Sequence, residues 1–255
     1  MQRIREARHT KYGPLRSRDA LNGAAHVLAL PRPAVSSAFH AELRHGWLHS
    51  QIARLGPAEF RRRIWHYTPG VLALLAAAVP YYEPVPMLIL LCAALFGLGL
   101  AAVAVRHQHT ICRAAERSCR TAIWGYAVAV VPLFLLFPRQ PELPLTVTGI
   151  IAFGDGSATL FGLLAGKRKL PWNKKKSWFG SAAFILAALP MAMLTYWAGS
   201  IPHPSPVQAG LCVGVSVLVA DFVESLPLRF NDNGYVGTSA AVTLIVMHGL
   251  VVGWQ

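Results

Sequence analysis

Long apolar runs separated by short polar segments fill the chain after residue 60. Each run is 17 to 21 residues long, enough for a helix to cross a hydrocarbon core of about 30 Å at about 1.5 Å per residue. The runs are continuously apolar rather than alternating, so they indicate helices and not barrel strands. We therefore expect an all-α, polytopic membrane helix bundle with about seven transmembrane helices, over Ile64–Tyr82, Met87–Val105, Thr121–Phe137, Leu145–Leu164, Trp178–Ala198, Val207–Leu226 and Thr238–Trp254.

Composition agrees with a membrane protein and excludes other classes. Apolar residues make up 54% of the 255 residues and charged residues 14%, whereas soluble domains carry about 25% charge. The net charge is nevertheless +13. A nucleic-acid-binding protein needs cations spread over a wide polar face, which this chain lacks. We expect a lipid bilayer and no nucleic acid among its partners.

The cations lie in alternate connecting segments. All of the 24 Lys and Arg residues except Arg139 precede the first run or lie in the loops after the second, fourth and sixth runs. The positive-inside rule places such segments in the cytoplasm. We expect a multi-pass protein of the cytoplasmic (inner) membrane with a cytoplasmic N-terminus.

Residues 1–60 differ from the rest of the chain. They are basic, and apolar residues recur within them at a spacing of three to five residues, which is typical of an amphipathic helix lying on an anionic membrane surface. For residues 1–33, a poorly ordered tail is an equal alternative. We expect a basic N-terminal extension over 1–60 and a membrane-embedded domain over 61–255. The apolar positions of the helix are Phe39, Leu43, Trp47, Leu48, Ile52 and Leu55.

Three acidic residues lie inside apolar runs: Asp155, Asp221 and Glu224. A charge at the bilayer centre costs about 2.5–3.5 kcal/mol, so intramembrane acids are candidates for function. Asp221 and Glu224 share one helix face because they are three residues apart. Carboxylates beside lysines suit Mg²⁺ and a phosphate-bearing ligand. The alternative is an interhelical ion pair or a protonated, hydrogen-bonded acid.

The segment Lys167–Ser177, here called the basic loop, carries six cations within ten residues. It is either a topology signal that contacts lipid headgroups or a clamp for the phosphates of a nucleotide. A P-loop is excluded because three rather than four residues separate Gly162 from Gly166 and because Arg168 stands where Ser or Thr should hold the metal. The two glycines instead predict close helix packing.

The four cysteines contain no C-x-x-C pair. We expect no disulfide framework, no zinc site and incidental thiols in the loop between the second and third runs. The cysteines are Cys92, Cys112, Cys119 and Cys212.

Three motifs span about residues 61–240. The first motif is a basic pair, Arg62 and Arg63, followed by His66 and Gly70. The longest motif runs from Gly154 through the basic loop to Ser181, and the third runs from Glu224 to Asn233. With these motifs the chain resembles the dolichol kinase/phytol kinase family of polyprenol and lipid kinases, which is distantly related to the CDP-diacylglycerol synthases.

The resemblance implies a CTP-dependent kinase that transfers the terminal phosphate to the hydroxyl of an isoprenoid alcohol, such as phytol or a polyprenol, with Mg²⁺ as cofactor. It makes residues 61–255 a membrane-embedded catalytic domain with an active site facing the cytoplasm. It implies that Asp155 is a metal ligand or the catalytic base. Carried over position by position, the motifs assign metal binding to Asp155, Asp221, Glu224 and Asp232, and nucleotide or phosphate binding to Gly154, Gly156, Arg168, Lys174, Lys175, Lys176 and Asn233.

The sequence departs from the family at Phe179, where many members have Glu. Two other functions stay open. A cytidylyltransferase that forms a CDP-lipid would need a C-terminal motif that does not follow Asp221. A transporter that uses the intramembrane acids would more often show paired halves, and none are visible here.

Overall fold

The computed structural model describes residues 35–80, 85–112, 119–228 and 232–254 and divides the chain into two units, Met1–Ser50 and Gln51–Gln255. In the first unit the described residues are helical and form the start of α1 (Val35–Ala77). The predicted amphipathic helix is therefore a helix from residue 35, while the side chains up to residue 54 lie outside the described residues. Its place on a membrane surface stays a prediction.

The second unit begins within α1, whose helix is broken at Gly56. Gly56 has φ 71° and ψ 159°, a left-handed conformation that glycine adopts without the steric cost of a Cβ atom. The helices that follow are α2 (Met87–Arg106), α3 (Gln108–Ile111), α4 (Cys119–Leu136), α5 (Glu142–Gly149), the π-helix η1 (Ile150–Asp155), α6 (Gly156–Ala165), α7 (Trp178–Gly199), α8 (Pro206–Ser225) and α9 (Asp232–Val251).

The described residues form no β-strand, apart from one isolated bridge between Lys169 and Ser177. Six of the described helical stretches are long and apolar enough to cross a membrane. The all-α helix bundle is thus confirmed, and the expected count of about seven is approximate. The predicted run Ile64–Tyr82 is not among the six; its described part belongs to the longer helix α1. The six stretches are Met87–Arg106, Cys119–Leu136, Glu142–Ala165, Trp178–Gly199, Pro206–Ser225 and Asn233–Val251.

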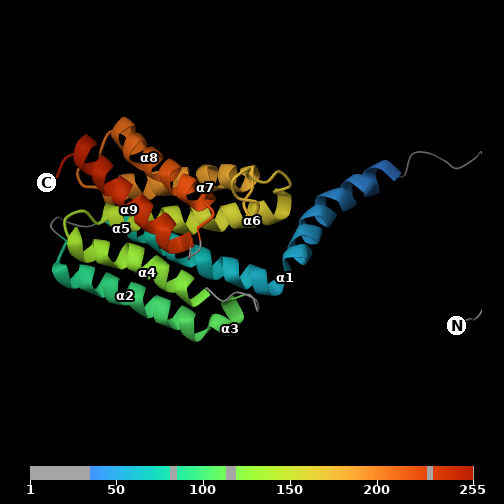
Figure 1. Cartoon of the computed structure of the whole chain (residues 1–255), viewed down its shortest axis with the longest axis horizontal. Helices are drawn as coiled ribbons and strands as arrows, with labels where there is room; N and C mark the ends of the chain where they lie inside the picture. The colour runs from blue at the N-terminus through green and yellow to red at the C-terminus, as the bar shows by residue number, and fades with distance from the viewer. Residues whose placement is uncertain (1–34, 81–84, 113–118, 229–231, 255) are drawn as a thin grey trace, which may run out of the picture. The chain divides into compact units, whose positions relative to one another are not determined.

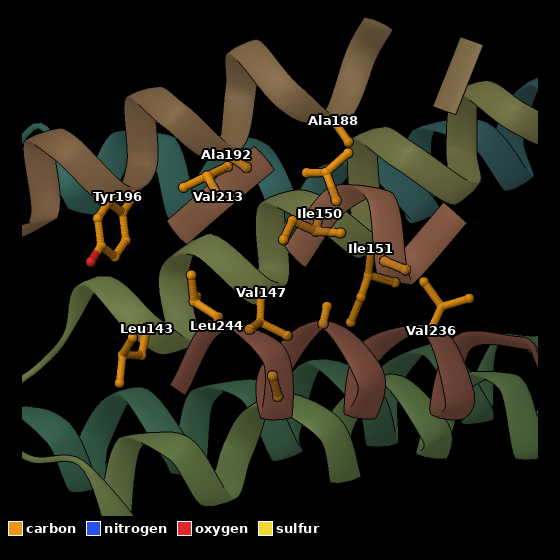
Figure 2. Packing of buried hydrophobic residues seen from close by; sticks show 14 of the residues in the cluster. Leu143, Val147, Ile150, Ile151, Ala188, Ala192, Tyr196, Val213, Val236 and Leu244 are labelled. Atoms are coloured by element: carbon orange, nitrogen blue, oxygen red, sulfur yellow. The ribbon is translucent and has the colours of Figure 1, made fainter. Parts of the chain in front are cut away.

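The centre of the second unit is α5 with η1, which together pack against α4, α7, α8 and α9, and α6 continues this stretch toward the edge of the bundle (Figure 1). Val147, Ile150 and Ile151 have no exposed surface and lie between helices α7, α8 and α9 (Figure 2). On α7 the facing positions include Ala188 and Ala192, whose small side chains let two helices approach closely. The stretch that carries Asp155 is therefore the most enclosed part of the bundle.

The segments rich in cations gather at one end of the second unit. The C-terminal end of α2, which carries Arg106, and the basic loop after α6 lie at the end opposite the C-terminus (Figure 1). This arrangement agrees with the alternation of charge along the sequence. Which side of a membrane that end faces stays a prediction.

The prediction of free thiols in the loop after α2 is wrong. Cys112, which ends α3, and Cys119, which begins α4, form a disulfide with a Cα–Cα distance of 5.9 Å. That distance lies in the range a disulfide bridges. The sequence did not reveal this pairing, because a disulfide between the two cysteines depends on how α3 and α4 lie relative to each other. Cys92 and Cys212 are free.

Candidate functional site

Helix α1 holds the N-terminus of α6 through buried polar contacts. The Arg63 guanidinium donates a hydrogen bond to the carbonyl of Gly156 (3.1 Å) and forms a buried ion pair with Glu59, to which its Nε donates at 3.0 Å. One turn further, the hydroxyls of Tyr67 and Ser157 lie 3.0 Å apart. These contacts fix α1 against the residues that directly follow Asp155.

His66 lies between these contacts and faces Asp155. Its Nε2 lies 3.2 Å from the carbonyl oxygen of Ile151 and 3.3 Å from Oδ2 of Asp155. Because a carbonyl oxygen can only accept, Nε2 carries the hydrogen and donates it. The Asp155 side chain is only 13% exposed, so the acid that the sequence places in an apolar run lies within ion-pair distance of a histidine of α1.

Asp155 is the last residue of η1, which is the only π-helix among the described residues. Single π-helical turns inside α-helices occur frequently at functional sites. The flanking glycines are surrounded by aromatic rings. A Cβ on Gly154 would lie 2.6 Å from the ring of Phe184, and one on Gly156 would lie 2.9 Å from the ring of Tyr67. Close packing thus accounts for both glycines, and their predicted role in phosphate binding stays a prediction.

A cavity of about 410 Å³ lies beside His66, between α1, α2 and α4. Its walls are mainly apolar, and polar side chains occur at a few positions, among them Arg62, His66, Tyr126 and Asn233. A pocket of this size and character suits an apolar ligand with one polar group. His66 both lines the cavity and contacts Asp155, so its side chain lies between the acid and the cavity.

The basic loop folds back on itself as a short hairpin-like turn. The amide of Leu170 donates to the carbonyl of Lys176 (3.1 Å), and that of Trp178 donates to Arg168 (3.2 Å). Leu170 is only 1% exposed and anchors the loop in the bundle. In contrast, Lys174 and Lys175 at its tip are exposed, as is Arg168. The predicted phosphate-binding cations Arg168, Lys174 and Lys175 are therefore exposed on a loop whose backbone is held by hydrogen bonds.

Asn173, which carried no role of its own in the sequence prediction, attaches the basic loop to the end of α8. Its Nδ2 donates to the carbonyls of Ser225 (3.1 Å) and Leu226 (3.2 Å), and its Oδ1 accepts from the amide of Lys175 (3.1 Å). Its side chain is buried. The amide of Asn173 thus joins the cationic loop to the helix that carries Asp221 and Glu224.

The structure brings Lys176, Asp221 and Glu224 together. Lys176 and the buried Glu224 form an ion pair, and Asp221 interacts with Ser181 of α7 and with the charge of Lys176. One carboxylate oxygen of Asp221, Oδ1, is buried without a hydrogen-bond partner among the described residues. An acidic oxygen of this kind fits a bound divalent cation.

The predicted metal ligands do not form one cluster. Asp155 faces His66 on α1, whereas Asp221 and Glu224 face Lys176 and α7. Within the described parts of the chain, no three His, Cys, Asp or Glu side chains gather closely enough to hold a metal ion. The side chain of Asp232 lies outside the described residues. The four-residue metal set stays a prediction.

Two further positions from the motifs have clear places. Asn233 lines the cavity, and its Nδ2 donates to the carbonyl of Ala122 on α4 (3.3 Å). Phe179, which replaces the family's Glu, is 48% exposed and packs edge-on against Phe161 of α6. The side chain at position 179 therefore lies on the outer surface between α6 and α7.

The main residues that the sequence prediction missed are on α1. Arg63 and His66 stood in the first motif without an assigned role, and Glu59 and Tyr67 were not singled out. Their spacing places them on one helix face, because positions three, four and seven apart lie above one another. That periodicity could have indicated a polar face on this helix in the sequence. Only the fold shows that this face lies against Asp155.

Sequence comparison finds phytol kinases among the relatives of this chain. A probable chloroplastic phytol kinase of Triticum aestivum is 35% identical over 133 residues, covering 49% of this chain and 43% of the relative. The resemblance to the phytol kinases is confirmed. Phytol kinase 1 of Arabidopsis thaliana, also chloroplastic, is 30% identical over 113 residues, which is 42% of this chain and 37% of that protein. A probable phytol kinase 2 of Oryza sativa subsp. japonica is 29% identical over 211 residues, or 72% of this chain and 65% of the relative.

The chain thus spans less than half the length of the first of these kinases. No family model matches it, and no solved structure is similar to it. The more distant link to the CDP-diacylglycerol synthases stays an expectation.

Proposed function

We propose that this chain transfers the terminal phosphate of a nucleoside triphosphate, with CTP as the donor, to the hydroxyl of an isoprenoid alcohol such as phytol or a polyprenol. The observation that carries the proposal is the position of Asp155. It lies beside an apolar cavity, on the same helical stretch that leads into the basic loop, in a chain similar to phytol kinases.

The alcohol occupies the apolar cavity with its hydroxyl toward His66. The carboxylate of Asp155 takes up the hydroxyl proton as the oxygen attacks the terminal phosphorus. A new phosphorus–oxygen bond forms, and the bond to the departing nucleoside diphosphate breaks. His66, whose Nε2 lies 3.3 Å from Oδ2 of Asp155, positions the carboxylate for this step.

The nucleotide lies along the basic loop with its phosphates at Arg168, Lys174 and Lys175, the exposed cations described above. Helix α6 joins this loop to the acid: Gly162, which faces Ser177 of the loop, follows Asp155 by seven residues, or about 10 Å along a helix. Phosphoryl transfer depends mainly on positioning and on neutralising charge, and both are supplied by such a loop.

Mg²⁺ is the proposed cofactor, and the described residues fit it at one place. The unpartnered, buried Oδ1 of Asp221 and the carboxylate of Glu224 on the same helix face would hold it, beside Lys176. When bound, the cation neutralises charge on the phosphates. We place the end of the bundle that carries the basic loop in the cytoplasm, and the protein in the cytoplasmic membrane, because that end holds the cations.

The test uses the purified chain in detergent with phytol, geranylgeraniol, a polyprenol and diacylglycerol, each offered with γ-³²P-labelled CTP, ATP, GTP or UTP. We expect label in the isoprenoid alcohols, most of it from CTP. Asp155→Asn should lower the transfer rate by about 100-fold or more, the contribution typical of a positioned acid–base group. The melting temperature of the variant reports its folding.

Ser157→Ala serves as the matched control, since it removes a hydrogen bond with Tyr67 two residues from Asp155 but no charge. It should retain most of the activity. Full activity in Asp155→Asn would remove Asp155 from the site.

A further inference from the structure

The cavity beside His66 owes its volume to the small residues in its walls. Seven alanines and Gly97 line it, contributed by α1, α2 and α4. Larger aliphatic side chains at these positions would close the space. The alanines are Ala73, Ala76, Ala93, Ala101, Ala104, Ala122 and Ala127.

The cavity is elongated along α1. Its lining begins at Arg62 and His66 and continues to Ala76, and Arg62 and Ala76 are 14 residues, or about 21 Å, apart on the helix. The polar side chains Arg62, His66 and Asn233 contrast with Ala73 and Ala76 further along. The site therefore has a polar head, next to Asp155, and an apolar tail region.

One side of the cavity opens onto the outer surface of the bundle. Leu72 of α1 and Phe96 of α2 both line it and are 37% and 60% exposed. In a bilayer this surface meets acyl chains, so a lipid can enter sideways without passing through water. The volume of about 410 Å³ lies in the range of pockets that enclose a small-molecule ligand.

We propose that this cavity holds the tail of one isoprenoid alcohol of about diterpenoid length, which enters from the bilayer between Leu72 and Phe96 and places its hydroxyl at His66. The inference rests on the proposed function and adds where the tail lies and how much of it the protein encloses. A longer polyprenol keeps the rest of its chain in the bilayer.

The test fills the tail region and leaves the head unchanged. Ala73 follows His66 by seven residues, or about 10 Å, and is buried. Ala73→Leu adds three carbons to the wall of the tail region and so takes up part of its space. Ala102→Leu is the matched control, since Ala102 is exposed and does not line the cavity.

In Ala73→Leu we expect kcat/KM for geranylgeraniol and phytol to fall at least about tenfold, because a displaced tail moves the hydroxyl out of line. The short dimethylallyl alcohol ends before position 73 and should be phosphorylated as well as by the wild type. Ala102→Leu should match the wild type with every alcohol. Equal losses on the short and long alcohols, or no loss on either, would overturn the inference.

A second measurement does not depend on turnover. Geranylgeraniol with a photoreactive diazirine at its far end should label peptides of α1 and α2, and Ala73→Leu should remove that labelling. Labelling confined to other helices would overturn the tail site. If the wild type phosphorylates no alcohol but the probe labels α1 and α2, the proposed function fails while the lipid site stands.

Discussion

Gly154→Ala tests whether the turn that carries Asp155 is held by close packing. A Cβ at this position would lie 2.6 to 2.8 Å from three ring atoms of Phe184. Real Cβ atoms do not approach other atoms so closely, so either the ring or the π-helix must move. Phe184 has no exposed surface and belongs to the central core, which leaves its ring little room to move.

The expected cost is that of inserting one methyl group into a full core, about 1–3 kcal/mol. In a chain of this length that corresponds to a fall in melting temperature of about 2–12 °C. If the turn itself shifts, Asp155 moves away from His66, and the transfer of phosphate falls more than stability does. The assay compares thermal unfolding in detergent with the rate of label transfer to phytol.

Gly214→Ala is the matched control. A Cβ on Gly214, inside α8, would meet nothing within 4 Å. Removing a glycine from a helix interior should stabilise it by about 0.5–1 kcal/mol. The packing argument would be refuted if Gly154→Ala melted with the wild type, or if both alanine variants lost the same stability.

Three other variants test the remaining parts of the site. The double variant Lys174→Ala, Lys175→Ala should raise the KM for the nucleotide by about tenfold or more. Its melting temperature should stay unchanged because both side chains are exposed. An unchanged KM would exclude these lysines as ligands of the nucleotide phosphates. Arg63→Gln should lower the free energy of unfolding by roughly 3 kcal/mol because it breaks a buried ion pair with Glu59. Arg61→Gln, at an exposed position, should leave it almost unchanged. Equal melting temperatures of the two variants would contradict a stabilising role of the Arg63 ion pair. Asp221→Asn should raise the Mg²⁺ concentration needed for half-maximal transfer by about tenfold or more, and an unchanged Mg²⁺ titration would place the cation elsewhere.

The fold class was predictable because long apolar runs leave a chain few alternatives in a membrane. The position of Asp155 in its run, the cations of the basic loop and the pairing of Asp221 with Glu224 on one face could also be seen in the sequence. Each of these features depends on residues close together in the chain, where helical periodicity determines which side chains lie on the same face.

The contacts between distant segments could not be predicted. His66 and Asp155 are separated by 89 positions, and their contact depends on how α1 packs against η1. The π-helical turn and the disulfide between Cys112 and Cys119 depend on tertiary packing in the same way. Lys176 was predicted as a phosphate ligand, yet its ion pair with Glu224 becomes visible only when α8 lies beside the basic loop.

The most direct test of the central claim is the transfer of the terminal phosphate from γ-³²P-labelled CTP to phytol by the purified, folded protein in the presence of Mg²⁺. We predict a labelled lipid that migrates with phytyl monophosphate and that is lost in Asp155→Asn. No labelled lipid from any alcohol or nucleotide in the panel, with a protein that still shows a cooperative melting transition, would contradict it.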